Sequence, residues 1–420
     1  MQLERAKGTR DLTPEEEILK SHLLDTLKKT FELYGYNPLQ TPLFERLETF
    51  KLKYAGGEEI LKEVFTLKDQ GQRDLALRFD LTVPFARYIG MNQNIKMPFK
   101  RYQIGEVFRD GPIKFGRYRQ FTQCDIDIVG AKSLLAELEL LTLAQETFKQ
   151  LKLDTTLKIN NIKILKALMR KTGIKEENEG SIILTLDKLE KIGKEGVEQE
   201  LNQKGLEQEK IQELLSILLS KGSSQQKILT LKKILGENEG LQELEFLLKK
   251  IPNLVFEPSL ARGLNYYTGT IYEGHLKNSE IKSSICSGGR YDHLISEMLK
   301  INRNFPTLGL SFGLDVILDA IKLQHKEEQK TVTKVFVIPI QTENEALKLC
   351  HELRKAGINT DMDLLTRGIS KNLDYAKYFK IPYVIILGTD EVKKKKFTLK
   401  NMNTGKEKLF TLKNLIKELK

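Results

Sequence analysis

The spacing of hydrophobic and polar positions divides the chain into stretches of different character. In residues 1–155, a helical spacing of apolar residues from Leu19 to Phe31 precedes several runs in which apolar and polar residues alternate, and this combination indicates an α+β unit. Residues 156–251 are rich in leucine, lysine and glutamate at the spacing of amphipathic helices. Strand patterns return directly afterwards. We therefore expect residues 1–155 and 252–325 to form one domain, split by a helical module at 156–251.

A further domain is predicted at residues 331–420, after a polar stretch. Three apolar, strand-like runs alternate there with two helical patterns, an order typical of α/β units with right-handed parallel crossovers. The strand-like runs are 335–340, 358–364 and 383–387, and the helical patterns are 345–355 and 370–379.

Charge is unevenly distributed. The formal net charge is +11, and residues 331–420 account for +8 of it, with 18 Lys and Arg against 10 Asp and Glu. A basic terminal domain suggests a polyanion as partner, because lysine and arginine gain free energy by displacing counterions at phosphates. A solvated, lysine-rich surface explains the charge equally well at this point.

Composition and motifs argue against several classes of protein. The cysteines, Cys124, Cys286 and Cys350, lack the spacing of a disulfide framework or a zinc site, so we expect each to be buried. No apolar run reaches the roughly 20 residues that span a bilayer, and the charged start lacks the core of a signal peptide, so a cytoplasmic protein is expected. The glycine-rich phosphate loops of common nucleotide folds are also absent, so side chains must hold any nucleotide.

Two strand-like runs carry charged residues on one face. In 75–83 the apolar residues alternate with Ala76, Arg78, Asp80 and Thr82. In 117–127 one face holds Arg117, Arg119, Phe121, Gln123, Asp125 and Asp127, and a second strand, 102–109, precedes it as the other arm of a hairpin. Such faces suit a ligand with a phosphate or carboxylate at one end and an amine at the other. A solvated face with structural ion pairs is the alternative.

The sequence of this hairpin matches a known motif. Phe-Arg-Asp-Gly-Pro, followed by Gly-Arg-Tyr-Arg-Gln-Phe-Thr-Gln-Cys-Asp-Ile-Asp up to Asp127, resembles motif 2 of class II aminoacyl-tRNA synthetases in its histidine-specific form. Lys7-Gly-Thr-Arg-Asp11, Leu77 to Arg87 and Arg262-Gly-Leu-Asn-Tyr-Tyr267 match the family in the same order. The last of these resembles a signature used only by histidine enzymes.

Weaker matches extend the resemblance over nearly the whole chain. They are Pro42 for motif 1, 308–315 for motif 3, Gly288-Gly-Arg-Tyr-Asp292 for the second histidine signature, and 367–371 with 374–376 for the anticodon-binding domain. The resemblance implies an α+β fold: a class II antiparallel-sheet catalytic domain with a helical insertion, followed by a C-terminal α/β anticodon-binding domain. It also implies a homodimer joined through motif 1.

The resemblance implies a pocket for histidine. Asp80 and Thr82 match the acceptors of the substrate's α-ammonium group, with Gln123 beside them. Asp127 and Tyr267 match the residues that hydrogen-bond the two ring nitrogens, and buried polar groups of this kind reject analogues that leave them unpaired. The walls of the pocket match Tyr266 and Gly289.

An ATP site adjoins this pocket in the family. Arg109 matches the arginine that contacts both the α-phosphate and the histidine carboxylate, and Arg262 matches a second catalytic arginine at the same place. Arg117 matches the residue that reaches the outer phosphates. Phe121 would stack on adenine, and Asp110 would lie at the nucleotide.

The implied activity is that of a histidine–tRNA ligase. The histidine carboxylate attacks the α-phosphorus of ATP, pyrophosphate leaves, and the tRNA's 3′-hydroxyl then takes the histidine and releases AMP. ATP is the implied cosubstrate and Mg²⁺ the implied cofactor, with Mg²⁺ bridging the outer phosphates and no metal-ligand residue predicted on the protein. L-histidine and the histidine tRNA are the implied partners, and no membrane is involved.

The chain departs from the family pattern at three places. Val316 stands where motif 3 has an arginine that contacts adenine and the γ-phosphate. Asn265 replaces the usual aspartate of the histidine signature, and Asp110 must serve for a glutamate that normally follows the motif 2 arginine. The alternative function is therefore a non-catalytic paralogue, such as the regulatory subunit of ATP phosphoribosyltransferase or a tRNA-sensing module.

Overall fold

The computed structural model describes residues 3–53, 61–113, 116–263, 266–324 and 329–420. These residues form two compact units, one made of residues 3–10 and 23–324 and the other of residues 11–22 and 329–420. Among the described helices, none is both long and apolar enough to cross a membrane. All three cysteines are buried and free, as the sequence predicted.

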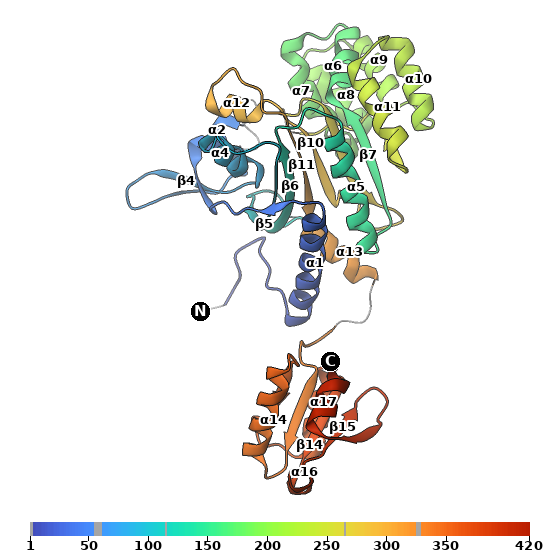
Figure 1. Ribbon diagram of the computed structural model, residues 1–420. Helices are drawn as coiled ribbons and strands as arrows, with labels where there is room; N and C mark the ends of the chain where they lie inside the picture. The colour runs from blue at the N-terminus through green and yellow to red at the C-terminus, as the bar shows by residue number, and fades with distance from the viewer. Residues whose placement is uncertain (1–2, 54–60, 114–115, 264–265, 325–328) are drawn as a thin grey trace. The chain divides into compact units, whose positions relative to one another are not determined.

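An eight-stranded sheet forms the centre of the first unit (Figure 1). Its strands lie in the order β1-β5-β6-β11-β10-β9-β7-β8, and all neighbours are antiparallel except the edge pairs β1/β5 and β7/β8. This is the antiparallel sheet that the sequence predicted. The strands are β1 (Asn37–Pro38), β5 (Phe99–Phe108), β6 (Gln120–Val129), β7 (Thr155–Asn161), β8 (Leu254–Phe256), β9 (Thr270–Leu276), β10 (Cys286–Arg290) and β11 (Thr307–Gly313).

The predicted hairpin is present as β5 and β6, with Phe108 opposite Gln120. The second arm begins at Gln120, three residues later than predicted, so that Arg117 to Arg119 precede the strand. The carbonyl of Arg119 accepts from the N–H of Arg109 at 2.8 Å, and its N–H donates to the carbonyl of Gly8 at 2.9 Å.

Two helices pack on one face of this sheet, α1 (Pro14–Leu33) and α5 (Leu135–Gln150) (Figure 1). The predicted helical spacing of α1 buries Leu23, Leu27 and Phe31. The rings of Phe31 and Phe148 each lie 5.7 Å from the ring of Phe312 on β11. Since side chains alternate along a strand, the residues next to Phe312 face the opposite side of the sheet.

A small three-stranded sheet, in the order β2-β4-β3, lies beside the main one, together with short helices. The prediction of one strand over 75–83 was wrong: β4 ends at Leu77 and a helix begins at Thr82. Asp80 causes the change, because its Oδ1 accepts from the N–H of Val83 at 2.8 Å, and Pro84 is tolerated in a first helical turn. The elements are β2 (Phe44–Arg46), α2 (Leu47–Lys53), β3 (Thr66–Lys68), β4 (Asp74–Leu77), α4 (Thr82–Met91) and α12 (Leu294–Leu299). Helix α13 (Leu314–Gln324) follows β11 and packs instead against β6 of the main sheet.

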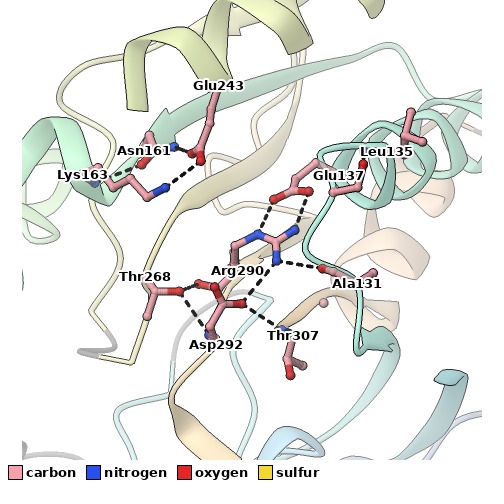
Figure 2. Close-up of polar contacts among 12 residues, drawn as sticks. Ala131, Leu135, Glu137, Asn161, Lys163, Glu243, Thr268, Arg290, Asp292 and Thr307 are labelled. Carbon is pink, nitrogen blue, oxygen red and sulfur yellow. Dashed lines mark hydrogen bonds and ion pairs between the residues drawn. The ribbon is translucent and has the colours of Figure 1, made fainter. Parts of the chain in front are cut away.

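Helices α6 to α11 follow β7 and gather at one end of the sheet (Figure 1). The predicted start of this module at residue 156 falls inside β7, which pairs with β9 and so belongs to the sheet. Glu243 ties the first helix to the last, since it accepts from Asn161 Nδ2 and from Lys163 Nζ, both at 2.6 Å (Figure 2). The helices are α6 (Ile162–Lys171), α7 (Glu176–Leu186), α8 (Leu189–Gln203), α9 (Gln208–Leu218), α10 (Ser224–Leu235) and α11 (Glu239–Lys250).

The second unit contains a five-stranded sheet in the order β13-β12-β14-β15-β16. The three predicted runs form its parallel part, and both predicted helices are present. The antiparallel strands β15 and β16 and the helices beside them were not predicted from the sequence. The elements are β12 (Val335–Pro339), α14 (Glu343–Lys355), β13 (Thr360–Met362), α15 (Ile369–Tyr378), β14 (Tyr383–Leu387), α16 (Thr389–Lys394), β15 (Phe397–Asn401), β16 (Glu407–Phe410) and α17 (Leu412–Leu419).

Candidate active site

A pocket of about 490 Å³ lies on the side of the sheet opposite α1 and α5, a size that suits a small-molecule ligand. Strand register aligns residues of the sheet at this pocket in two rows across five strands. One row contains Glu273, Ser287, Ser311, Asp125 and Gln103, and the next contains Ile271, Gly289, Gly309, Asp127 and Arg101. Ten of the twelve predicted site residues line this pocket: Asp80, Thr82, Arg109, Arg117, Phe121, Gln123, Asp127, Arg262, Tyr266 and Tyr267.

Asp127 is held at the deep end of the pocket by two residues that the sequence analysis did not assign. Arg101 Nη2 lies 2.6 Å from Asp127 Oδ2, and the Tyr291 hydroxyl donates to Asp127 Oδ1. Arg101 is completely buried, so the pair is shielded from water. Opposite Asp127, Gly309 leaves the necessary space, because a Cβ there would collide with the carboxylate.

Aromatic rings enclose this end of the pocket. The rings of Tyr266 and Tyr267 lie 4.6 Å apart, and Tyr266 meets Tyr291 edge to face at 5.5 Å. A Cβ on Gly289 would approach Tyr267 to 2.8 Å, so glycine is needed where the backbone passes the ring. A flat, polar ring is the ligand that such walls and the Asp127 carboxylate favour.

Acceptors for a cation lie beside Asp127. Gln123 donates to Ser311 Oγ at 2.9 Å, and its Oε1 is buried without a hydrogen bond from any described residue. Oδ1 of Asp125 is likewise buried and accepts no hydrogen bond from a described residue. Burial raises the pKa of Asp125 to about 7, against the opposing effect of the Arg101 charge. Together with Asp80 at the start of α4, these oxygens form an acceptor set suited to an ammonium group.

Arginines line the more open end. The guanidinium of Arg109 lies 4.3 Å from the ring of Phe79 and 5.0 Å from that of Phe121. Arg117 is 43% exposed and its Nη2 lies 3.4 Å from Glu63, a pocket residue without an assignment in the sequence analysis. An exposed ion pair of this kind is weak, so Arg117 is available to an anionic ligand.

Two predicted site residues, Gly289 and Asp110, are not among those that line the pocket. The carboxylate of Asp110 lies 2.9 Å from Arg119 Nη2 instead. Its backbone N–H donates to the carbonyl of Glu63, which brings the Glu63 side chain to this end of the pocket. Glu63 follows a stretch without a motif, so the sequence offered no signal for it.

Arg262 is a half-buried cation on the opposite wall. It forms an ion pair with Glu273 on β9, and its Nη2 donates to Ser287 Oγ on β10 at 3.0 Å. Its Nε is buried and has no hydrogen-bond acceptor among the described residues. Two neighbouring strands thus fix the direction of the guanidinium while one of its donors stays available.

The start of α13 is tied to the N-terminal segment. Arg10 lies 2.6 Å from Asp315 and 3.2 Å from Asp319, and Asp315 also accepts from the N–H of Thr122 on β6 at 2.7 Å. Val316, which follows Asp315 directly, lines the pocket. It occupies the position at which motif 3 of the family has an arginine. Asn265, the second departure, lies outside the described residues.

The segment Gly288 to Asp292 is anchored to neighbouring elements by the side chains of Arg290 and Asp292 (Figure 2). Arg290 donates to both carboxylate oxygens of Glu137 on α5, at 2.6 and 2.7 Å. Asp292 accepts from the N–H of Thr307 at 2.9 Å. Tyr291 lies between these two anchored residues, so the hydroxyl that reaches Asp127 is held from both sides.

The comparisons with known proteins agree with this geometry. A family model described as histidyl-tRNA synthetase matches residues 8–317, and one described as an anticodon binding domain matches residues 334–420. The chain belongs to the histidyl-tRNA synthetase family. The match includes both rows of the pocket and ends one residue after Val316.

Relatives of this histidyl-tRNA synthetase family member match over nearly full length. A histidine–tRNA ligase 1 of Bacillus cereus is 44% identical over 416 residues, 97% of this chain and 95% of the relative. A histidine–tRNA ligase of Helicobacter pylori is 38% identical over 418 residues, 95% and 93% of the two chains. The crystal structure of histidyl-tRNA synthetase from Nostoc sp. PCC 7120 matches with a TM-score of 0.84 and 33% identity, covering 100% and 99%.

The non-catalytic alternative is not favoured. A structure from Bacillus halodurans, described as an ATP phosphoribosyltransferase regulatory subunit/histidyl-tRNA synthetase, matches with a TM-score of 0.75 but 21% identity, covering 92% and 99% of the two chains. A likeness at that identity concerns the fold alone. The relatives that match this synthetase family member at 44% identity are described as ligases.

Proposed function

We propose that the pocket is the active site of a histidine–tRNA ligase, which activates histidine with ATP and transfers it to the 3′ end of its tRNA. The observation that carries this proposal is the order of groups across the pocket. A buried carboxylate between tyrosine rings lies at one end, cation acceptors lie beside it, and arginines line the other end. Histidine and a triphosphate together have the complementary order of charges.

Histidine would lie along β6. Its imidazole would contact Asp127 and Tyr267, with Tyr266 as a wall, and its ammonium group would meet Asp80, Thr82 and Gln123. Asp125 extends that acceptor set, because its Oδ1 is buried and accepts no hydrogen bond from a described residue. The carboxylate of histidine would then point toward Arg109 and Arg262.

ATP would lie at the arginine end. Phe121 would stack on adenine, with Arg109 at the α-phosphate, Arg117 at the outer phosphates and Asp110 at the rim. Mg²⁺ would enter with ATP, since such ions bind phosphates plus one or two carboxylates, and Glu63 beside Arg117 is a suitable carboxylate. The described residues contain no group of three potential ligands that could hold a metal by itself.

The first step needs no general base, because the histidine carboxylate is already anionic. It forms a bond to the α-phosphorus as the bond to pyrophosphate breaks. Arg109 and Arg262 would stabilise the charge that builds on the α-phosphate oxygens. In the second step the 3′-hydroxyl of the tRNA attacks the carbonyl of the adenylate, and AMP leaves with the phosphate.

The proposal extends to partners. The second unit would bind the anticodon arm of the histidine tRNA, and the helical module at 156–251 its acceptor arm. Two copies would pair through motif 1, where Leu43 is 44% and Phe44 52% exposed, a level of apolar exposure that a partner subunit would cover. We also propose that the protein acts in the cytoplasm.

Charging of tRNA transcripts tests the function. The purified protein, with ATP and labelled histidine, should acylate a histidine tRNA transcript and leave a transcript for another amino acid uncharged. Sedimentation equilibrium on the same sample should give twice the chain mass. Absence of acylation, with the tRNA still bound in a filter assay, would support the non-catalytic alternative.

A further inference from the structure

The inserted helical module contributes two residues to the active-site pocket, Asp187 and Lys191. Neither belongs to a motif that the sequence comparison identified. Asp187 follows the last residue of α7, and Lys191 lies in the first turn of α8. The module therefore reaches the site where the chemistry takes place.

Asp187 lies against the turn that carries Arg262. It accepts a hydrogen bond from the backbone N–H of Gly263, and a Cβ on Gly263 would lie 2.7 Å from Asp187 Oδ2. The charge of Arg262 opposes the effect of burial, which raises the pKa of Asp187. Asp187 thus connects the module to the backbone beside Arg262.

Lys191 lies in a single helical turn that ends at Gly193. Lys191 N–H and Ile192 N–H both donate to the carbonyl of Lys188, which closes one helical turn. Gly193 then breaks the helix with φ 70° and ψ 178°, a conformation that essentially only glycine adopts. A Cβ at Gly193 would meet nothing within 4 Å, so conformation rather than space requires the glycine.

Lys191 differs from the lysines on either side of it. Lys188 lies 2.9 Å from Glu200, and Lys194 lies 3.4 Å from Glu198. Lys191 is exposed, and its charge lowers the pKa of Asp187 without forming a close ion pair with a described residue. Its ammonium group is therefore available to a ligand in the pocket.

The pocket has a shortage of positive charge for a triphosphate. Among its described lining residues, four are basic, Arg109, Arg117, Lys191 and Arg262, and six are acidic, Glu63, Asp80, Asp125, Asp127, Asp187 and Asp315. Arg262 and Arg117 already face carboxylates. Val316 adds no charge where the family pattern has an arginine. Lys191, whose charge is shared only with the nearby Asp187, is a further basic group that could contact the phosphates of ATP.

We propose that Lys191 binds a phosphate of ATP in the active site, and that Asp187 positions the Arg262–Gly263 turn for the same substrate. This inference rests on the proposed function and deepens it. The inserted module, beyond any contact with tRNA, then becomes part of the ATP site. Lys191 takes over the phosphate contact that Val316 cannot make.

The test compares Lys191→Ala with Lys191→Arg and with the control Lys194→Ala in the full chain. ATP affinity is measured by calorimetry, and ATP and histidine KM values by histidine-dependent pyrophosphate exchange. Lys191→Ala should weaken ATP binding and raise the ATP KM about tenfold, equivalent to about 1.4 kcal/mol, with the histidine KM within about twofold. The arginine variant should restore most of the loss, and Lys194→Ala should behave as wild type.

Unchanged ATP affinity in Lys191→Ala would overturn the inference. If the same variant also showed a raised KM for tRNA in the acylation assay, Lys191 would be assigned to the phosphates of tRNA. If the wild-type protein shows no exchange, the proposed function fails, but the calorimetric comparison still decides whether Lys191 binds the nucleotide.

Discussion

The carboxylate of Asp127 is shared between the protein and its proposed ligand. Arg101 and Tyr291 hold it in the structure, and the histidine ring would be its third contact. Two features of the sequence pointed to Asp127: the alternation in 117–127 placed it on the polar face of a strand, and motif 2 matched it to a residue that contacts histidine. They could not reveal Arg101, since pairing across β5 and β6 depends on the register of the hairpin.

This sharing determines which substitution tests Asp127. Asp127→Ala would leave the buried Arg101 charge without a partner, at a cost of about 3–5 kcal/mol in the free energy of unfolding. Asp127→Asn also removes the negative charge but keeps the shape and an acceptor oxygen for Arg101, and it should raise the KM for histidine about 10- to 100-fold through loss of a charged hydrogen bond worth about 1.5–3 kcal/mol. The KM for ATP should stay within about twofold in exchange kinetics. Equal increases for both substrates would contradict the ring contact.

Asp125 predicts a pH dependence of stability. Its pKa is raised by burial to about 7 in the folded state, against about 3.9 in the unfolded chain. A raised carboxyl pKa stabilises the fold below about pH 4, and this contribution is lost as pH rises to about 7. Asp125→Asn should remove that loss, so its free energy of unfolding in urea should fall less between pH 5 and 7 than that of wild type. Parallel pH profiles of the two proteins would refute the assignment.

Helices and strands differed in how well the sequence predicted them. The apolar spacing of α1, the hairpin of β5 and β6 and the parallel core of the second unit were found correctly. Residues 75–83 were not, because a perfect alternation of residues hid the helix start that Asp80 and Pro84 create. Contacts made through the packing of distant elements, such as Lys191 in the pocket, have no local pattern at all.

Anchoring of the inserted module can be measured on α11. Glu243 accepts two hydrogen bonds at 2.6 Å and is 17% exposed, so Glu243→Ala should lower the free energy of unfolding by about 1–3 kcal/mol. Glu245 on the same helix pairs with Lys232 at 43% and 39% exposure, and Glu245→Ala should cost less than about 1 kcal/mol. Thermal unfolding of both variants gives the comparison. A Glu243 variant as stable as the Glu245 variant would show that the tie contributes little.

The uneven distribution of net charge along the chain is a property of the whole molecule. Residues 331–420 carry +8 of the net +11, and the match to an anticodon binding domain covers residues 334–420. The match favours the polyanion interpretation of this charge over a merely solvated surface. Sequence composition alone could not separate the two, because both predict exposed lysines.

Salt should therefore weaken tRNA binding strongly. Between 50 and 200 mM KCl, the KM for tRNA should rise at least about tenfold, because binding releases counterions from the tRNA phosphates and this release gains less free energy at higher salt. The KM for histidine, measured by exchange without tRNA, is the control and should change little. A KM for tRNA that is insensitive to salt would remove the role proposed for the basic unit.

The central claim is that this pocket activates histidine. Amino-acid-dependent exchange of labelled pyrophosphate into ATP measures that step without tRNA. With each of the twenty amino acids supplied in turn, histidine alone should give exchange, and Asp127→Asn should shift its concentration dependence. Exchange with a different amino acid, or none with any, would contradict the account.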